Sequence, residues 1–211
     1  MAPRREKSPC SKTGKRVYQH YNGKFKKQVY IIHPGEYYAS DEPVLISTVL
    51  GSCVAVALYD AQRRLGGLNH FMLPGSLDRQ NFMMSETGKY GMFAMELLIN
   101  ELIKHGARKE RLRAKVFGGG HVLQNDAGDN GGVPQSNIDF AFEYLKTENI
   151  PVETSDVGGT VGRKIFLDPQ SFKVMLKRIT GRLIVDVEKE EEEYLEQLRK
   201  RRQQKRKGDV T

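Results

Sequence analysis

Short apolar runs separated by glycine and polar turns set the pattern of this chain. Each run has the length of a β-strand, and four of them occupy residues 27–33, 44–49, 54–59 and 66–72. The polar stretch between the last two runs, residues 60–64, is short enough to predict a hairpin turn. Because neighbouring strands lie about 5 Å apart, this hairpin would bring Cys53, where one strand opens, close to His70, near the end of the next.

Helices are predicted beside these strands. Apolar side chains recur at helical spacing in residues 90–105, and Gly106 follows as a glycine stop. A second helix is predicted to begin with Ser136 as its N-cap and to run to residue 149. Further strands are predicted at residues 115–117, 164–167 and 172–179.

Length and charge together predict one domain with two extensions. A chain of 211 residues suits one sizeable core. Residues 1–28 hold nine bases and one acid, and residues 186–211 hold eight of each, so 17 of the 34 bases and 17 of the 26 acids remain for residues 29–185. We expect a flexible basic leader over 1–28, a neutral core domain over 29–185 and a charged tail over 186–211. The neutral core argues against a nucleic-acid partner, although binding through the basic ends stays a minor alternative.

The tail has the charge order of a helix. Its acids come first, from Asp186 to Glu196, and its bases cluster in residues 199–207. This order matches the helix macrodipole, which favours anions near the N-terminus and cations near the C-terminus. We expect an exposed charged helix. A docking role stays open, since a few apolar side chains are present: Val187, Tyr194, Leu195 and Leu198.

A cytoplasmic location without an integral membrane segment is expected. The sequence has no run of about 18 apolar residues for a membrane span, and its basic N-terminus lacks the apolar run of a secretory signal. Nothing holds Cys10 and Cys53 in disulfide geometry, which suits a reducing compartment.

Cys53 is the main candidate for chemistry. Gly51 allows a flexible turn that delivers the thiol to the start of an apolar strand. A nearby imidazole is the usual means of converting a thiol to the nucleophilic thiolate, so the pair with His70 suggests acyl transfer. Spacing alone leaves open a buried structural cysteine beside a strand, because such cysteines are common.

Metal and nucleotide sites have little support in the sequence. The five histidines are dispersed, with no pair at i and i+4, and no Cys-x-x-Cys occurs. Three glycines at 118–120 are followed by His121 and Val122, whereas a P-loop needs a lysine and a serine or threonine there. We predict no metal site and no cofactor. The glycines are interpreted as allowing a close approach of the backbone to the catalytic site or an adjacent turn.

Several separated motifs resemble the CheD family of chemoreceptor glutamine deamidases. They are residues 48–56, 67–74, 90–92 and 115–120, then Asn137 and residues 156–164. The likeness covers about residues 29–180, and its motifs, in the right order, are more specific than either candidate catalytic residue alone. The resemblance implies an α/β fold with a layered, sandwich-like β core flanked by helices.

The activity implied by the resemblance is that of a cysteine hydrolase, a protein-glutamine glutaminase. Such an enzyme converts glutamines of methyl-accepting chemotaxis receptors to glutamate and releases ammonia. Carried over by position, Cys53 is the nucleophile, His70 the general base and Thr48 the third catalytic residue. Ser47, its neighbour, is the other candidate hydroxyl.

The resemblance also bears on binding. Gly51, Ser52 and Asn69 are the expected substrate-binding residues. The implied partners are the receptors and a CheC-type phosphatase. The alternative to the enzyme is a non-catalytic regulatory binding partner of that phosphatase or of the receptors, which would need neither an intact thiol nor an intact imidazole.

Overall fold

Two five-stranded sheets and three α-helices form the fold, which the computed structural model describes for residues 18–75, 77, 85–122, 132–180 and 182–208. The first sheet has the spatial order β1 (Tyr18–Asn22), β2 (Lys27–Ile31), β4 (Leu45–Leu50), β9 (Gly162–Leu167) and β10 (Val174–Ile179). The second has the order β3 (Tyr37–Ser40), β6 (Leu65–Asn69), β5 (Val54–Asp60), β7 (Leu112–Gly118) and β8 (Val152–Val157). The helices are α1 (Glu86–Lys104), α2 (Gly132–Thr147) and α3 (Arg182–Gly208), and a 3-10 turn covers Lys109–Arg111.

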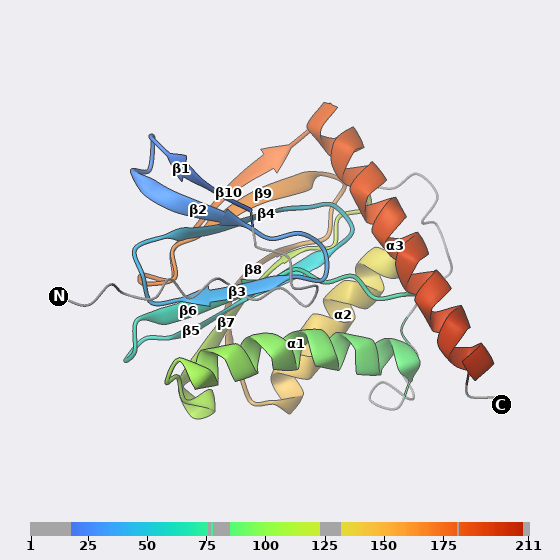
Figure 1. The fold of residues 1–211 in the computed structure, drawn as a ribbon, viewed down its shortest axis with the longest axis horizontal. Coiled ribbons are helices and arrows are strands. Elements are labelled where there is room, and N and C mark those ends of the chain that lie inside the picture. The colour runs from blue at the N-terminus through green and yellow to red at the C-terminus, as the bar shows by residue number, and fades with distance from the viewer. Residues whose placement is uncertain (1–17, 76, 78–84, 123–131, 181, 209–211) are drawn as a thin grey trace.

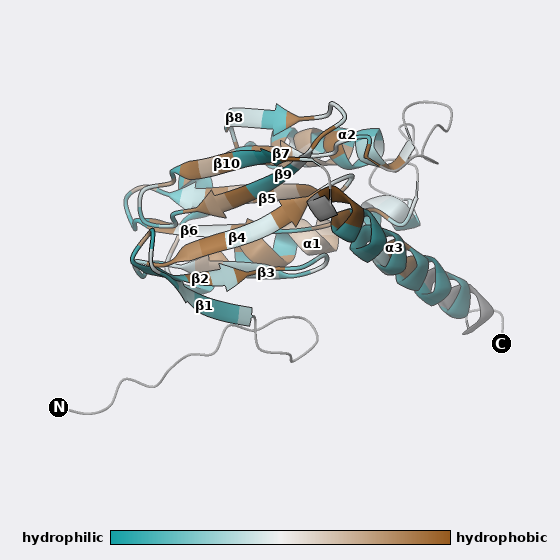
Figure 2. Cartoon of the chain, turned by 90° about the horizontal axis from the view of Figure 1, so that it is seen from above, coloured by the Kyte–Doolittle hydropathy of each residue, from teal (hydrophilic) through white to brown (hydrophobic). Residues whose placement is uncertain are grey.

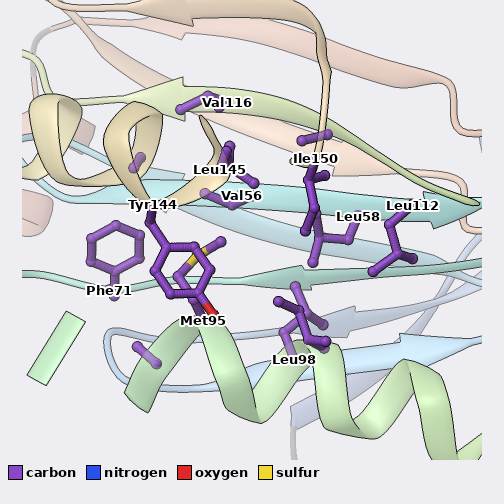
Figure 3. Packing of buried hydrophobic residues seen from close by; sticks show 14 of the residues in the cluster. Val56, Leu58, Phe71, Met95, Leu98, Leu112, Val116, Tyr144, Leu145 and Ile150 are labelled. Atoms are coloured by element: carbon purple, nitrogen blue, oxygen red, sulfur yellow. The ribbon is translucent and has the colours of Figure 1, made fainter. Parts of the chain in front are cut away.

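The elements form three layers, as the resemblance implied. The two sheets face each other, and α1 and α2 cover the outer face of the second sheet (Figure 1). One apolar core lies between the sheets and includes Ile46, Ala55 and Ile165. The other lies between the second sheet and the two helices, where Val56 and Leu98 pack (Figure 3). The α/β fold class with a layered β core is therefore confirmed.

Strand β5 lies in the middle of both cores. Its side chains alternate between the two faces of the sheet, so that Val54 and Val56 enter the core under the helices while Ala55 and Ala57 enter the core between the sheets. All four are fully buried. This explains why the strand reads as a continuous apolar run, and why small side chains alternate with larger ones along it.

The predicted hairpin is present as β5 and β6. These strands pair antiparallel, with Asp60 opposite Leu65 and Tyr59 opposite Gly66. At the open end of the hairpin, Val54 forms an isolated bridge with Phe71. The residues before Val54 and Phe71 are Cys53 and His70, so the hairpin register brings both to the same end of the sheet.

The two helices predicted for the core are both present, as α1 and α2, but each begins at a different residue from the one predicted. α1 begins four residues earlier than predicted, where the Ser85 hydroxyl accepts a hydrogen bond from Gly88 N–H at 3.0 Å. Gly106 follows its end with a φ of 94°, as a glycine stop requires. The prediction that Ser136 caps α2 is wrong, because this helix already begins at Gly132. The Ser136 hydroxyl instead accepts a hydrogen bond from Leu77 N–H at 3.0 Å.

The predicted tail helix is present as α3, but it is not simply exposed. Most of its surface is hydrophilic (Figure 2), whereas Val187, Leu195 and Leu198 are buried. The helix crosses the end of the molecule where the turn between β4 and β5 lies (Figure 1). Residues 18–22 of the predicted leader form β1, paired with β2, and residues 1–17 lie outside the described residues.

Among the helices that the structure describes, none combines the length and apolar character needed to cross a membrane.

Candidate active site

The turn between β4 and β5 fixes the backbone around Cys53. Its three carbonyls all accept hydrogen bonds: Gly51 from Gly120 N–H at 2.7 Å, Ser52 from the Asn137 amide at 2.9 Å, and Cys53 from Gly119 N–H at 2.7 Å. With its carbonyls held in this way, the turn presents three successive N–H groups to a single acceptor. Successive N–H groups aimed at one point form a site for an anion.

That site holds the carboxylate of Glu191 from α3. One oxygen of Glu191 accepts from Gly51 N–H at 2.9 Å and from Cys53 N–H at 3.1 Å. The other accepts from the N–H and the hydroxyl of Ser52, each at 2.7 Å. We call the donors of Gly51, Ser52 and Cys53 the carboxylate cradle. Glu191 is only 1% exposed, so the cradle is closed to solvent by α3.

His70 is held from both sides of its backbone and through its ring. Its N–H donates to Glu36 carbonyl at 2.9 Å, and its carbonyl accepts from Gly35 N–H at 2.7 Å. Its ring Nδ1 lies 2.8 Å from the Thr48 hydroxyl oxygen, which is itself 2.7 Å from the Ile32 carbonyl oxygen. Because a carbonyl can only accept, the single hydroxyl proton of Thr48 goes to Ile32 and Nδ1–H donates to Thr48. The neutral ring then has its lone pair on Nε2.

Nε2 of His70 is buried and has no hydrogen-bond partner among the described residues. The Cys53 sulfur, a His70 ring nitrogen and a Glu191 oxygen all lie within 4.8 Å of one another. An unpartnered basic nitrogen beside a thiol is the arrangement that proton transfer from the thiol requires.

The electrostatics of the closed site favour the neutral thiol and the neutral imidazole. Burial raises the pKa of the Cys53 thiol well above its usual range, and the nearby Glu191 carboxylate raises it further. Burial lowers the pKa of His70 to about 3. Both groups are fully enclosed, with Cys53 at 0% and His70 at 2% exposure. The thiolate is therefore disfavoured while α3 covers the site.

The glycine run 118–120 behaves as interpreted from the sequence. A Cβ at Gly118 would collide with the Cys53 carbonyl oxygen, and Gly120 lies against the Gly51 carbonyl. Gly118 and Gly119 also have positive φ values of 107° and 65°. The close approach lets this segment donate two of the three hydrogen bonds that orient the turn.

Asn137 is a further positioning residue, fully buried on α2. Its amide nitrogen donates to the Ser52 carbonyl, and its oxygen accepts from Leu73 N–H at 2.8 Å. It therefore ties the Cys53 turn to the segment that follows His70. The sequence marked Asn137 only as a motif position, and a buried asparagine in an apolar helix face is the signal that could have found this use.

The structure separates the two candidate hydroxyls. Thr48 lies at His70, whereas the Ser47 hydroxyl donates to the Ile165 carbonyl at 2.9 Å. Adjacent strand residues face opposite sides of a sheet, and Thr48 shares the side of Ile46 and Leu50, which face the second sheet. Ser47 therefore faces away from His70.

The expected substrate-binding residues fall into two groups. Gly51 and Ser52 belong to the carboxylate cradle. The Asn69 amide lies within the core, where its oxygen accepts from Val56 N–H at 2.9 Å and its nitrogen donates to the Ala94 carbonyl at 3.3 Å. A substrate-binding role for Asn69 stays a prediction. Glu191 was missed, because in the sequence it is one of four consecutive acids on a charged helix.

The donor set also bears on metal binding. A thiol, an imidazole and a carboxylate that lie this close are ligands that a transition metal can use. Here both oxygens of the carboxylate are taken by N–H and O–H donors. The arrangement is equipped for acyl transfer: a nucleophilic sulfur, a basic nitrogen and a cluster of N–H groups able to hold an oxyanion.

Comparisons with known proteins identify relatives of this chain. The family described as CheD chemotactic sensory transduction matches residues 72–178, a stretch that begins just after His70. The probable chemoreceptor glutamine deamidase CheD 1 of Shewanella oneidensis is 44% identical over 161 residues, which is 76% of this chain and 77% of the relative. The protein with the same description from Dechloromonas aromatica is 45% identical over 161 residues, 76% of this chain and 78% of its own.

A longer match exists in Thiobacillus denitrificans. Its probable chemoreceptor glutamine deamidase CheD is 40% identical over 180 residues, covering 85% of this chain and 88% of the relative. Among solved structures, the hypothetical protein YfiH of Bacillus licheniformis aligns with 58% of this chain and 51% of its own, with 14% identity and a TM-score of 0.39.

Proposed function

This chain belongs to the CheD family, and we propose that it deamidates glutamine side chains of methyl-accepting chemotaxis receptors, with Cys53 as nucleophile and His70 as general base. The observation that carries the proposal is the meeting of thiol, unpartnered imidazole nitrogen and N–H cradle at the end of the hairpin. The reaction belongs to bacterial chemotaxis, and we place it in the cytoplasm.

In the first half of the reaction, Nε2 of His70 removes the proton of the Cys53 thiol. The thiolate attacks the carboxamide carbon of the glutamine and forms a carbon–sulfur bond. The oxygen of that carboxamide becomes negative, and the N–H groups of the cradle are placed to stabilise it. The proton held on His70 then passes to the departing nitrogen, the carbon–nitrogen bond breaks, and ammonia leaves.

In the second half, water hydrolyses the thioester. His70 takes a proton from the water, hydroxide attacks the thioester carbon, the carbon–sulfur bond breaks, and His70 returns its proton to the departing sulfur, which regenerates the thiol and the neutral imidazole. The net change consumes one water and yields a glutamate side chain and ammonia. Thr48 acts through His70: by accepting from Nδ1–H it keeps the lone pair on Nε2, the nitrogen that both halves use.

A protein that served only as a regulatory binding partner would need neither the Cys53 thiol nor the His70 imidazole. Such a protein could tolerate any small side chain at position 53, and the buried, unpartnered nitrogen of His70 would be a cost without a use. The deamidase is favoured on this ground. A CheC-type phosphatase is kept as a proposed partner of the enzyme.

The test uses the purified chain and cytoplasmic fragments of methyl-accepting receptors. Each converted glutamine gains about 1 Da in peptide mass spectrometry, because NH₂ is exchanged for OH. We expect this gain with the natural chain and its loss with Cys53→Ala and with His70→Ala. Equal conversion by the natural chain and by both variants would overturn the proposal.

A further inference from the structure

Glu191 occupies the place that the proposed chemistry reserves for substrate. Its carboxylate accepts four hydrogen bonds from Gly51, Ser52 and Cys53. In the deamidation mechanism, the N–H groups of this same cradle hold the oxygen of the reacting carboxamide. A substrate glutamine and Glu191 therefore cannot use the cradle at the same time.

Glutamate is also the product of the reaction. The glutamate side chain has the carbon skeleton of glutamine, with a carboxylate in place of the carboxamide. The carboxylate of Glu191 lies within 4.8 Å of both the Cys53 sulfur and a His70 ring nitrogen. Glu191 thus resembles a product side chain that has not left the site.

Beyond Glu191, α3 packs against the rest of the molecule through one face of the helix. Val187, Leu195 and Leu198 are buried together with Glu191, and these four positions follow helical spacing. Two polar contacts lie along the same helix: Glu190 with His33 Nδ1 at 2.6 Å, and Tyr194 with the Tyr90 hydroxyl at 2.6 Å. The helix is therefore docked by apolar, ionic and hydroxyl contacts, and Glu191 is a charged group that these contacts hold fully buried.

Resting on the proposed deamidase function, we propose that α3 is an intramolecular inhibitor that fills the carboxylate cradle with Glu191 as a product-like side chain. A receptor glutamine reaches Cys53 only when α3 leaves the cradle. The segment that presents that glutamine competes with α3 for the same N–H donors. The seated carboxylate also raises the pKa of the Cys53 thiol, so departure of α3 both opens the site and favours the thiolate.

The test compares Glu191→Ala with Glu192→Ala in the full chain, both in a Cys10→Ser background so that Cys53 is the single thiol. Glu192 is the exposed neighbour on α3 and serves as the matched control. Two rates are measured: alkylation of Cys53 by iodoacetamide, and conversion of glutamines in receptor fragments. Glu191→Ala removes four charge-assisted hydrogen bonds, each able to shift an equilibrium by about a factor of ten, so both rates should rise at least about tenfold.

A second variant guards against local effects on the cradle. Leu198→Asp places a charge in the apolar face of α3, remote in sequence from Glu191, and should raise both rates while leaving every cradle residue intact. Glu192→Ala should match the parent chain. If Glu191→Ala and Leu198→Asp are alkylated no faster than the parent, or convert receptor glutamines more slowly, α3 is not an inhibitor.

Alkylation needs no receptor, which separates this proposal from the proposed function. A chain whose alkylation rises in Glu191→Ala, while no variant converts any receptor glutamine, supports occupancy of the site by α3 and overturns the receptor deamidase. A parent chain that converts receptor glutamines at the same rate as Glu191→Ala supports the deamidase and overturns the inhibitor.

Discussion

Replacing Thr48 with valine isolates the hydrogen bond that orients His70. Valine keeps the branched shape of the side chain and removes the hydroxyl, which lies 2.8 Å from His70 Nδ1 and 2.7 Å from the Ile32 carbonyl oxygen. Both Thr48 and His70 are buried, at 1% and 2% exposure, so water does not readily replace the lost partner. The imidazole then loses the contact that holds its proton on Nδ1.

The size of the effect follows from the burial. A buried donor or acceptor left without its partner costs about 1–3 kcal/mol, and if this cost appears in the transition state the rate falls by a factor of roughly 5 to 150. The loss should appear in kcat, with little change in KM, because Thr48 touches His70 rather than the substrate. Thr48→Ser, which restores a hydroxyl, should recover much of the activity.

Ser47→Ala is the matched control. The Ser47 hydroxyl is equally buried and also donates to a carbonyl, that of Ile165, but it faces away from His70. Receptor deamidation is followed by peptide mass spectrometry, and urea unfolding reports stability. We expect similar losses of stability in the two variants and a loss of kcat only in Thr48→Val. A loss of kcat in Ser47→Ala as large as that in Thr48→Val would refute the assignment.

Three further outcomes are expected. Burial lowers the pKa of His70 to about 3 in the folded chain, so as pH falls below about 6.5 the imidazole gains a proton in the unfolded chain before it does in the folded one. The natural chain should therefore lose about 2 kcal/mol more of its free energy of unfolding than His70→Gln between pH 7 and 5. Urea midpoints that change in parallel in the two chains would contradict this. The hydrogen bond that His33 Nδ1–H donates to the Glu190 carboxylate raises the pKa of His33, so this half-exposed pair stabilises docked α3 at low pH, by less than about 1 kcal/mol. The effect is lost as pH rises through the raised pKa. Amide exchange of α3, corrected for its intrinsic rate, should show lower protection at pH 9 than at pH 6, and Glu190→Gln should abolish that difference. Asn137→Ala leaves two buried backbone groups without partners and should cost about 2–6 kcal/mol in urea unfolding, whereas Glu143→Ala, on the exposed face of α2, should cost little.

The sequence was sufficient for the part of the site that depends on local chain geometry. A hairpin with a short turn and two strand-length arms has few alternatives, and its register carried Cys53 and His70 to the same end. The glycines at 118–120 were interpreted correctly, because glycine in a run signals close backbone approach whatever the partner. The choice between Ser47 and Thr48 needed the structure, because both faces of this strand are apolar: Ser47 shares one with Leu45 and Val49, and Thr48 shares the other with Ile46 and Leu50.

Contacts between residues far apart in the chain could not be predicted from the sequence. Nothing near Glu191 distinguishes it from its acidic neighbours, and only the docking of α3 by Val187 and Leu195 turns this one carboxylate toward the cradle. The start of α2 was placed at Ser136 by its capping preference, yet tertiary contacts use that hydroxyl elsewhere. Propensity describes what a residue can do locally, and packing decides which use prevails.

Glu191→Gln tests the proposed chemistry in a single molecule. The substitution places a glutamine carboxamide in the cradle beside Cys53, so residue 191 should be recovered as glutamate, with a gain of about 1 Da in its peptide over the encoded sequence. In Cys53→Ala with Glu191→Gln, and in Glu192→Gln, the introduced residue should stay glutamine. Glutamine persisting at position 191 with Cys53 intact, or converting equally without Cys53, would contradict deamidation by Cys53 at this cradle.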